Sequence, residues 1–499
     1  MAQKSKKQNK PFRPKARRPR GFEDRPADVM RAEAALVASA FAVYDSFGFE
    51  PLQTPAFEYA DALGKFLPDE DRPNVGVFAL QDDDEQWLSL RYDLTAPLAR
   101  YVAENYDGIP KPFRRYQAGS VFRNEKPGPG RFREFTQCDA DTVGAGGAVA
   151  DAEMIMVAAE VARAAGLGDY QYAVRVNNRK LLDGILEASG VANTEEGAMQ
   201  RLQVLRAIDK LDRLGEDGVE ALLGEGREDE SGDYTKGAKL NPAGIRAVLG
   251  FTTASDPDRE VTLATLSGLV GISDRGKAGV DELAEIDRLL TATGFGPERV
   301  SFDTSVVRGL GYYTGPVFEL ELLAEITDRK GRPVRIGSIG GGGRYDDLVS
   351  RFRGQAVPAT GFSFGVSRFV TALERMDALV AAAQPPVLIT VFDRALLPNY
   401  FQLASELRAA GIRAEVFTGS GNVTKQLKYA DRRGVTLAVL IGSDEAAADE
   451  VTIKDLVLGA EMAKAIETNE EWKSARPAQQ TVNRDQAVAT IRDMMSEQV

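Results

Sequence analysis

Histidine is absent from this 499-residue chain, and cysteine occurs once, as Cys138. The lack of histidine removes the most common general base, the most common metal ligand and the side chain that titrates near neutral pH. Acid–base chemistry must therefore use Asp, Glu, Lys, Tyr or the substrate itself. A single cysteine excludes an intrachain disulfide and a cysteine-built zinc site, so we expect no protein-bound structural metal and a reducing, cytoplasmic setting.

Long hydrophobic runs are also absent, because no apolar stretch approaches the roughly 18 residues that a bilayer-spanning helix requires. Hydrophobic residues make up 43% of the chain and charged residues 27%. That balance is typical of a soluble globular protein, and we expect no membrane partner. A length of 499 residues is enough for about three domains, each with its own core.

Acidic residues are missing from residues 1–20, which contain nine of the chain's 62 Lys and Arg residues. Without this segment the net charge changes from −12 to −21, so a basic arm is attached to an acidic body. Its Lys, Arg, Gln and Pro content predicts disorder. Two functions stay open for it, a contact with a nucleic-acid backbone or a solubilising leader. One serine and three prolines argue against a mitochondrial transit peptide.

Hydrophobic periodicity divides the rest of the chain. A helix of roughly 20 residues is predicted after Pro26, and GFEPLQTPAFE then reads as an edge or interface strand because prolines interrupt it. A strongly charged helical region precedes renewed β patterns, and a β-α-β-α-β-β series with a largely parallel sheet follows the AAAQPP linker. The predicted organisation is a basic tail (1–20), a core in two segments (21–183 and 296–380), a helical insertion (184–295), an α/β domain (385–470) and a C-terminal helical tail (471–499).

The segment FRRYQAGSVFRNEKPGPGRFREFTQCDADTVG places Arg123 at the end of an apolar strand, just before a hairpin tip of Pro and Gly. A second β run follows, with Gln137 and three acidic residues. An arginine at a strand end beside a flexible loop suits a phosphate clamp, because the guanidinium fork pairs bidentately with phosphate oxygens. Taken alone, the pattern fits a surface hairpin equally well.

Two further segments combine arginine with glycine. In VVRGLGYYTGPVFELE, Arg308 precedes glycines that allow the backbone to approach a ligand, and Tyr312 and Tyr313 point to opposite faces if the segment is extended. GGGGRYDDL, followed by GFSFGVSR, adds Arg344 and Arg368. The four-glycine run lacks the Lys-Ser/Thr ending of a Walker P-loop, and adjacent tyrosines are usually core and surface. Neither segment alone identifies a ligand.

In this order and over this length, the segments resemble the class II aminoacyl-tRNA synthetases, specifically the histidyl-tRNA synthetase family, from residue 20 to about residue 465. RGLGYYTGPVFE is similar to the signature with which that family binds histidine. The FRNEKPGPGRFREFTQCDAD hairpin resembles its motif 2, and GFSFGVSRF resembles its motif 3. The first helix with GFEPLQTPAFE resembles motif 1, which in the family forms the dimer interface around a proline, here Pro55.

The resemblance implies an α+β fold: a class II catalytic core with an antiparallel sheet flanked by helices, a helical insertion and a C-terminal α/β anticodon-binding domain. It implies a homodimeric ligase that activates L-histidine with ATP, accompanied by Mg²⁺, and transfers the histidyl group to the 3′ end of histidine tRNA. Four cations on the second helix of the α/β domain would contact the tRNA backbone or form an ordinary solvated face. They are Lys425, Lys428, Arg432 and Arg433.

Residue roles follow from the resemblance by motif position. Arg123 and Arg308 are the implied catalytic residues, which hold the ATP α-phosphate from two sides. Asp93 and Thr95 hold the α-amino group beside Gln137. The implied ATP-binding residues are Arg123, Glu125, Arg131 and Arg368. The implied histidine-binding residues are Asp93, Leu94, Thr95, Arg123, Gln137, Asp141, Arg308, Tyr312 and Tyr313.

Asp141 and Tyr313 match the positions that bond the two imidazole nitrogens, and Tyr312 lines the pocket. A site built around two ring hydrogen bonds leaves buried polar groups unpaired when another amino acid enters, so it can discriminate by roughly 10⁴ without editing.

The chain departs from the family pattern at three places. Gly311 stands where the signature usually has Asp, and Asn124 and Thr136 stand where family members commonly show histidines around motif 2. The motif 2 tip, residues 126–130, has glycine where many bacterial members have a polar side chain near the extra guanosine of histidine tRNA. We hypothesise that this chain reads that end of the tRNA differently.

Two other functions compete with the ligase. One is a non-catalytic histidine sensor of the kind found as the regulatory subunit of ATP phosphoribosyltransferase. The other is a synthetase-like module that only binds tRNA, as in starvation-sensing kinases, for which no kinase domain fits the length. The chain retains Arg123, Arg308 and Arg368 together, and it has a C-terminal domain that the regulatory subunit lacks. These features favour the ligase.

Overall fold

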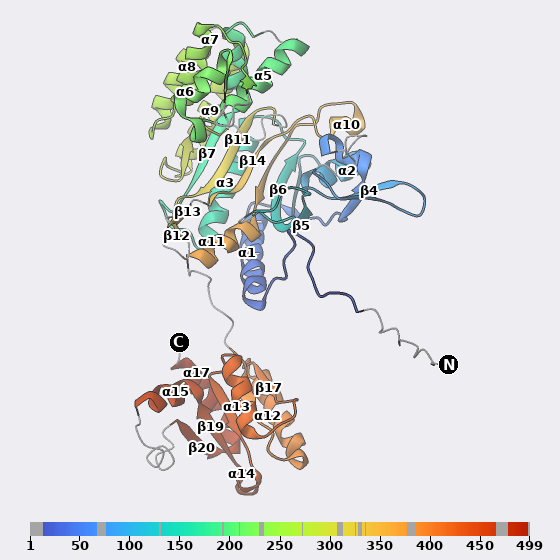
Figure 1. Cartoon of the computed structure of the whole chain (residues 1–499), viewed down its shortest axis with the longest axis vertical. Helices are drawn as coiled ribbons and strands as arrows, with labels where there is room; N and C mark the ends of the chain where they lie inside the picture. Colours follow the sequence, from blue (N-terminus) through green and yellow to red (C-terminus); the bar gives the residue numbers. More distant parts are fainter. Residues whose placement is uncertain are drawn as a thin grey trace, which may run out of the picture. The chain divides into compact units, whose positions relative to one another are not determined.

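The computed structural model describes most of the chain in segments. The described residues are 13–66, 76–128, 131–191, 194–208, 210–228, 234–271, 273–306, 313–324, 326–327, 332–334, 336–376, 385–465 and 478–497. The chain divides into two compact units, residues 1–379 and 380–499 (Figure 1). Among the described residues, no helix is long and apolar enough to cross a bilayer.

An eight-stranded sheet organises the first unit, in the order β1-β5-β6-β15-β14-β11-β7-β10. The inner neighbours all pair antiparallel, whereas β1 runs parallel to β5 and β10 runs parallel to β7 at the two edges. The predicted α+β class is therefore confirmed. The sheet was predicted to be antiparallel, and it is so except for its two edge strands, which pair parallel. The strands are β1 (Glu50–Pro51), β5 (Phe113–Phe122), β6 (Glu134–Val143), β15 (Ala359–Phe364), β14 (Gly337–Arg344), β11 (Pro316–Leu322), β7 (Tyr172–Asn178) and β10 (Val300–Phe302).

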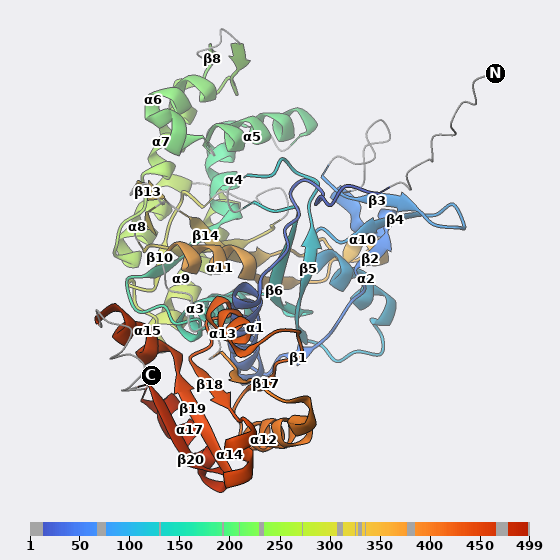
Figure 2. The same cartoon turned by 60° about the horizontal axis from the view of Figure 1, so that its bottom comes forward.

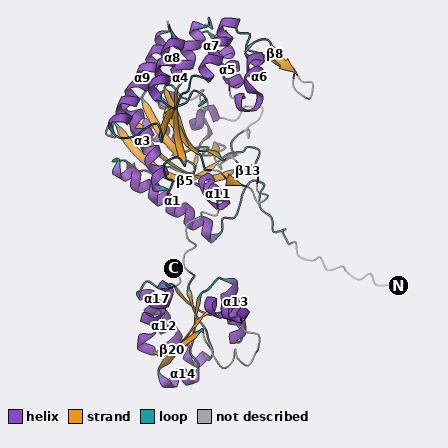
Figure 3. Cartoon of the chain, turned by 90° about the vertical axis from the view of Figure 1, so that its left-hand side faces the viewer, coloured by secondary structure: helices purple, strands orange, loops and turns teal. Residues whose placement is uncertain are grey.

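Three helices pack against this sheet, as Figure 3 shows. They are α1 (Ala27–Ser46), α3 (Ala148–Ala164) and α11 (Val366–Arg375). The first confirms the helix predicted after Pro26. Helix α3 consists largely of Ala, Val, Met and Ile, and most of its residues are buried because it crosses β15, β14, β11 and β7. This packing gives the glycine-rich and arginine-bearing strands a rigid support.

The region predicted as a separate insertion is helical, but it shares the core of the first unit. Leu283 and Leu290 of α9 are fully buried in the same cluster as residues of α3. Part of the acidic loop, residues 229–233, lies outside the described residues. The elements are α4 (Arg179–Ala188), α5 (Glu195–Ile208), α6 (Leu211–Leu223), β8 (Gly226–Glu228), β9 (Tyr234–Lys236), α7 (Pro242–Thr252), α8 (Arg259–Val270) and α9 (Asp274–Ala292).

A small three-stranded sheet, in the order β2-β4-β3, follows β1 and lies beside helix α2 (Thr95–Asn105) (Figure 2). Its strands are β2 (Phe57–Tyr59), β3 (Ala79–Gln81) and β4 (Trp87–Leu90). Glu58 on one face is buried and forms an ion pair with Arg100 of α2, with an N–O distance of 2.8 Å. The register places Phe57, Tyr59 and Leu80 on the opposite face, where all three are exposed.

The second unit contains a five-stranded sheet in the order β17-β16-β18-β19-β20. The prediction of a largely parallel sheet is only partly right, because β17, β16 and β18 are parallel but β18, β19 and β20 are antiparallel. The strands are β16 (Val387–Ile389), β17 (Ala414–Val416), β18 (Leu437–Leu440), β19 (Glu450–Asp455) and β20 (Gln479–Asn483). The helices are α12 (Leu397–Ala409), α13 (Val423–Arg432), α14 (Ser443–Ala448), α15 (Leu456–Ala465) and α17 (Ala487–Ser496).

The C-terminal segment differs from the predicted helical tail over 471–499. Strand β20 completes the sheet by pairing with β19, and α17 buries Ala487 and Ile491 in the core of the unit. Edge strand β20 has no fully buried residue, so its sequence has little of the apolar alternation that reveals a strand.

Candidate active site

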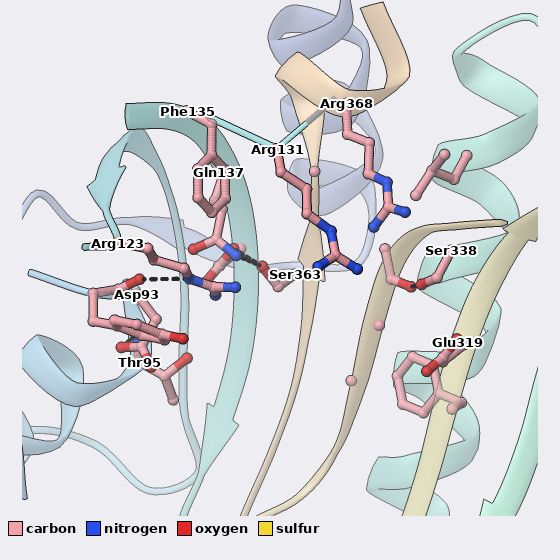
Figure 4. A pocket seen from close by; sticks show the side chains of 18 of the residues that line it. Asp93, Thr95, Arg123, Arg131, Phe135, Gln137, Glu319, Ser338, Ser363 and Arg368 are labelled. Carbon is pink, nitrogen blue, oxygen red and sulfur yellow. Dashed lines mark hydrogen bonds between the residues drawn. The ribbon is translucent and has the colours of Figure 1, made fainter. Parts of the chain in front are cut away.

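A cavity of about 800 Å³ opens in the first unit, between the hairpin formed by β5 and β6, the start of α2, and strands β14 and β11 (Figure 4). Strands β6, β14, β11 and β15 contribute residues to its wall, and Arg123 directly follows the end of β5. The cavity is lined by Tyr92, Asp93, Thr95, Arg123, Glu125, Arg131, Phe132, Phe135, Gln137, Asp139, Tyr313, Val317, Phe318, Glu319, Ser338, Ile339, Gly340, Gly341, Gly342, Ser363, Gly365 and Arg368.

Arg123 directly follows β5 and is held between two aromatic rings. Its guanidinium carbon lies 4.3 Å from the ring centroid of Tyr92 and 5.1 Å from that of Phe135. Its Nε donates a 3.4 Å hydrogen bond to the carbonyl oxygen of Tyr92. Cation–π contacts of this kind fix a guanidinium in one plane, so its donors are aimed at a ligand before the ligand arrives.

Asp93 organises the start of α2 at the cavity wall. Its Oδ1 accepts hydrogen bonds from the backbone N–H groups of Thr95, at 3.1 Å, and Ala96, at 2.9 Å. Burial raises the pKa of the Asp93 carboxyl, whereas these N–H groups and the nearby Arg123 lower it. The carboxylate is therefore oriented by the helix and lies beside a cation.

Gln137, Ser363 and Asp139 form a hydrogen-bonded chain along the floor of the cavity. Gln137 Nε2 donates to Ser363 Oγ at 2.9 Å, and Ser363 Oγ donates to Asp139 Oδ1 at 2.6 Å. Gln137 Oε1 is buried and has no hydrogen-bond partner among the described residues. Burial and the neighbouring carboxylate of Asp141 raise the pKa of Asp139 to about 8, while Arg115 and the bond from Ser363 act against the rise.

Asp141 is not among the residues that line the cavity, and its predicted contact with the imidazole stays a prediction. It is 2% exposed, and its Oδ2 lies 2.9 Å from a guanidinium nitrogen of the fully buried Arg115. The hydroxyl of Tyr345 donates to its other oxygen. Arg115 also donates to the carbonyl oxygen of Leu94, at 2.8 Å, and Leu94 is fully buried. Asp141 and Leu94 therefore support the wall from behind.

The far end of the cavity carries two more arginines. Figure 4 shows Arg131, from the hairpin, and Arg368, from α11, both pointing into the cavity. Arg368 donates to the carbonyl oxygen of Ile336 at 2.7 Å. Glu125 is positioned by Tyr92, whose hydroxyl donates to its Oε1 at 2.7 Å. Three guanidinium groups thus face one volume, which suits a polyanionic ligand such as a triphosphate.

Glycines on β14 keep this volume open. An ideal Cβ at Gly342 would lie 2.1 Å from the carbonyl oxygen of Gly361 and 2.5 Å from Cζ of Phe318, so no side chain fits there. At Gly341 the nearest atom to such a Cβ is the carbonyl oxygen of Phe318, at 3.2 Å. Gly341 is the register partner of Glu319, whose side chain lines the cavity. A side chain at residue 341 would therefore project toward the ligand volume.

Tyr313 brings a hydroxyl to the cavity. Burial raises the pKa of Tyr313 well above its usual value, and the carboxylates of Asp141, Asp139 and Asp93 raise it further. The phenol therefore stays protonated and able to donate a hydrogen bond at any physiological pH.

The structure brings together most of the site residues expected from the sequence. Those that line the cavity are Asp93, Thr95, Arg123, Glu125, Arg131, Gln137, Tyr313 and Arg368. Arg308 and Tyr312 lie outside the described residues, and so do Gly311 and two residues of the motif 2 tip, 129 and 130. Pro55 is exposed beside β2, away from the cavity lining.

Eight polar or aromatic residues of the wall are not among the site residues predicted from the sequence. They are Tyr92, Phe132, Phe135, Asp139, Phe318, Glu319, Ser338 and Ser363. A local signal existed for two of them, because Phe135 and Asp139 flank Gln137 at a spacing of two on one strand and must share its face. Ser363 reaches the site through its register with Asp139 across two strands, which no local pattern reveals.

The described residues hold no group of three or more Cys, Asp or Glu side chains arranged to bind a metal ion. Glu125 and Glu319 are carboxylates on the cavity wall. One or two carboxylates together with phosphate oxygens are the usual ligands of Mg²⁺, so the wall suits a metal ion that arrives with a nucleotide.

Comparison with known proteins agrees with this geometry. Residues 21–369 match the family model described as histidyl-tRNA synthetase, and residues 386–494 match that of an anticodon binding domain. A histidine–tRNA ligase of Caulobacter vibrioides is 55% identical, over 99% of this chain and 100% of the relative. One of Brucella ovis is 56% identical, over 97% of each chain. The crystal structure of a histidyl-tRNA synthetase from Nostoc sp. superposes with a TM-score of 0.73 at 28% identity, covering 97% of this chain and 100% of that one.

Proposed function

The chain belongs to the histidyl-tRNA synthetase family, and from this premise we propose that it is a histidine–tRNA ligase whose reaction takes place in the cavity around Arg123. The enzyme uses ATP to convert L-histidine to histidyl-adenylate and transfers the histidyl group to the 3′ end of histidine tRNA. The observation that carries the assignment of the site is the convergence of Arg123, Arg131 and Arg368 on one volume that also contains Gln137 and Tyr313.

In the first step the histidine carboxylate attacks the α-phosphorus of ATP, and pyrophosphate leaves. Negative charge spreads over the α-phosphoryl oxygens in the transition state, so a fixed cation there lowers the barrier more than it stabilises the bound substrates. Arg123 meets this need because two rings already hold its guanidinium. Arg308 takes the opposite side by motif position, and Arg131 and Arg368 take the outer phosphates. Glu125 would hold a Mg²⁺ ion, which would neutralise charge on these phosphates.

Histidine binds between the start of α2 and the floor of the cavity. Its ammonium group is held by Asp93 and Thr95 with the Oε1 of Gln137, a buried acceptor that needs a donor. Tyr313 donates to a ring nitrogen of the imidazole, and Tyr312 lines the pocket by motif position. Asp141 fixes Arg115 behind the cavity wall, and its contact with the second ring nitrogen remains the one predicted by motif position.

Transfer RNA engages the second unit, which matches an anticodon binding domain. Lys425, Lys428 and Arg432 are exposed on α13 and are available for phosphate contacts. Arg433 differs from them, because its guanidinium lies 3.3 Å from a carboxylate oxygen of Glu415. We assign it to the support of the helix.

A homodimer is supported by the apolar face of the small sheet. Phe57, Tyr59 and Leu80 are 44%, 57% and 45% exposed on one face, and Pro55 is exposed just before β2. A contiguous apolar face of this kind marks an interaction surface. Motif 1 of the family places the dimer contact here, so the occupant we assign is a second copy of the chain. The single, buried Cys138 suits a reducing, cytoplasmic setting.

ATP–pyrophosphate exchange with each amino acid in turn tests the function, followed by charging of histidine tRNA. Exchange with histidine alone, and charging of that tRNA alone, are the expected results. Histidine binding without exchange would instead assign the chain to the histidine sensors. The retained Arg123 and Arg368 and the second unit argue against that alternative.

A further inference from the structure

The chain before α1 is docked on the hairpin that lines the cavity. The backbone N–H of Arg133 donates a 2.8 Å hydrogen bond to the carbonyl oxygen of Gly21. Gly21 has a φ of +84°, and an ideal Cβ there would lie 2.9 Å from Cγ and Cδ of Arg133 and 3.2 Å from Cβ of Pro127. The ring of Phe22 packs 5.7 Å from that of Phe78. A glycine is therefore required where the chain presses against the hairpin.

A second anchor follows four residues later. Arg25 donates to Oε2 of Glu33 at 2.6 Å and to Oγ1 of Thr136 at 2.9 Å. Glu33 is 5% exposed, and its other oxygen accepts a 2.6 Å hydrogen bond from Ser367. Ser367 in turn accepts from the backbone N–H of Thr136, at 2.9 Å. The anchor thus joins the segment to β6 and α11, the elements that carry Gln137 and Arg368.

The residues just before these anchors carry only positive charge. We call residues 13–20 the basic arm; it holds five cations, all exposed: Arg13, Lys15, Arg17, Arg18 and Arg20. The described residues give the arm one acidic neighbour within ion-pair distance, Asp24, at 3.8 Å from Arg18. Both members of that pair are exposed, so the pair contributes little. The arm's charge is available to an anionic partner.

The arm's position identifies the partner. Its anchors lie on the hairpin whose residues Glu125, Arg131 and Phe132 line the cavity. In the proposed reaction the 3′ end of a tRNA must enter that cavity, so the last base pairs of its stem must pass the hairpin. Eight extended residues reach up to about 28 Å from Gly21. The body of the chain, with a net charge of −21, otherwise repels RNA.

We propose that the basic arm is a binding surface for the phosphate backbone of the tRNA stem that ends in the cavity. The inference rests on the proposed ligase function. The arm follows the backbone without reading bases, and its two anchors keep the cations at the cavity mouth. Anchoring matters because a tethered cation is present at a high local concentration, whereas a free tail is distributed over a larger volume.

The test compares the full chain with a variant in which the arm is neutralised by Arg13→Gln, Lys15→Gln, Arg17→Gln, Arg18→Gln and Arg20→Gln. Pyrophosphate exchange should not change, because no arm residue lines the cavity. The kcat/KM for tRNA in charging should fall about tenfold or more at 0.15 M salt. Each lost phosphate contact removes about 0.7–0.9 from the slope of log affinity against log salt, so the slope should become shallower by about 2–4.

Two controls make the outcome specific. Neutralising Arg163, Lys277 and Arg288, which are exposed at 65%, 57% and 70% on the same unit, should leave tRNA charging nearly unchanged. Gly21→Ala keeps every charge but strains the docking contact, so it should lower kcat/KM for tRNA without affecting exchange. This result would show that position, and not charge alone, is what the arm contributes.

The results separate the arm from the ligase function itself. Unchanged tRNA kinetics and an unchanged salt slope in the neutralised variant would overturn the proposal and leave the arm as a solubilising leader. A parallel loss of exchange and charging would also overturn it, because it would mean that the arm supports the folded cavity. Absence of exchange in the unaltered chain would refute the proposed function instead.

Discussion

Ser363 donates a 2.6 Å hydrogen bond to Asp139, and this bond determines how Gln137 presents its amide. A hydroxyl has one hydrogen, so once Ser363 gives it to Asp139 its oxygen can only accept. The Nε2 of Gln137 donates a 2.9 Å hydrogen bond to this oxygen. The amide oxygen Oε1 of Gln137 is therefore left as the end of the amide that has no partner among the described residues. A buried acceptor suits the ammonium group of histidine. Asp139 is therefore a positioning residue that acts through Ser363.

Asp139→Asn tests this relay. The new amide can donate to Ser363, which then donates to Oε1 of Gln137 and turns the NH₂ of Gln137 toward the ammonium. Above pH 8, where the Asp139 carboxyl is ionised and can only accept, the two side chains differ most. Loss of a hydrogen bond to a charged group costs about 1.5–3 kcal/mol, so at pH 8.5 the KM for histidine in pyrophosphate exchange should rise about 10- to 100-fold. The KM for ATP should change little, because the relay does not extend to Arg131 or Arg368.

Ser363→Ala serves as the matched variant. It removes the hydrogen-bond partner of Gln137 Nε2 but does not turn the NH₂ group toward the ammonium, so the KM for histidine should rise less than in Asp139→Asn. Equal effects of the two substitutions, or an equal rise in the KM for ATP, would mean that Asp139 only supports the local packing.

The raised pKa of Asp139 predicts how stability depends on pH. The pKa of its carboxyl is about 8 in the folded chain against a usual value of 3.8, so between about pH 4 and pH 8 the native state keeps a proton that the unfolded chain has lost. The contribution of this carboxyl to the free energy of unfolding is therefore largest at low pH, and it is lost as the pH rises to about 8. Asp139→Asn should therefore flatten the decline and stabilise the chain above pH 8 by about 1–3 kcal/mol. Urea unfolding of both chains at pH 6 and pH 8.5 measures the difference; parallel pH profiles would contradict it.

Arg123→Lys separates charge from geometry at the reacting phosphate. Lysine keeps the charge but loses the planar fork and its packing between Tyr92 and Phe135. The kcat of pyrophosphate exchange should fall about 100-fold, as expected for one lost transition-state donor, with a small change in the KM for histidine. Arg131→Lys is the matched substitution, and it should act mainly on the KM for ATP. If Arg123→Lys keeps its kcat, the fixed fork is not what stabilises the transition state.

Two neighbouring glycines of β14 should respond in opposite ways to alanine. A Cβ at Gly342 would meet the carbonyl oxygen of Gly361 at 2.1 Å, so Gly342→Ala should lower the thermal midpoint strongly or prevent folding. In Gly341→Ala the new Cβ would lie 3.2 Å from its nearest neighbour, the carbonyl oxygen of Phe318, and would add a methyl group beside Glu319. It should fold with a similar midpoint but lose about tenfold in kcat/KM for exchange, which corresponds to about 1.4 kcal/mol. A fully active Gly341→Ala would show that substrates do not occupy this end of the cavity.

The fold was predictable from the sequence where patterns are local. The helix Ala27–Ser46 and the long β5–β6 hairpin follow from the periodicity of their own residues. Strand β20 was missed because an edge strand of a small sheet buries too little to impose an alternation. The glycine run was recognised, but its function as the open wall of a cavity depends on Phe318 and Gly361, which belong to two other strands.

The site shows the same division. Asp141 shares a strand face with Gln137, and its carboxylate is held by Arg115 and Tyr345. Tyr345 is 204 residues away in the chain, so no local pattern could reveal this contact. Asp139 could have been found from its spacing of two from Gln137, but its partner Ser363 is brought to it only by the pairing of β15 with β6.

The apolar face of the small sheet predicts the assembly of the enzyme. Glu58 and Ser89 fill the other face, so Phe57, Tyr59 and Leu80 are left with no cover within the described part of one chain. Charged substitution on an apolar interface leaves an unpaired charge in the contact, which costs several kcal/mol. Tyr59→Glu with Leu80→Glu should therefore convert a dimer to monomers, as measured by light scattering across a range of concentrations.

The choice of control determines what that result means. Val149→Glu and Tyr170→Glu alter apolar side chains that are 61% and 76% exposed elsewhere on the unit, so they should leave the mass unchanged. Circular dichroism of both variants must match that of the parent chain, because a monomer produced by unfolding says nothing about the face. If the small-sheet variant stays dimeric and folded, the second copy binds elsewhere, and the exposed face needs another occupant.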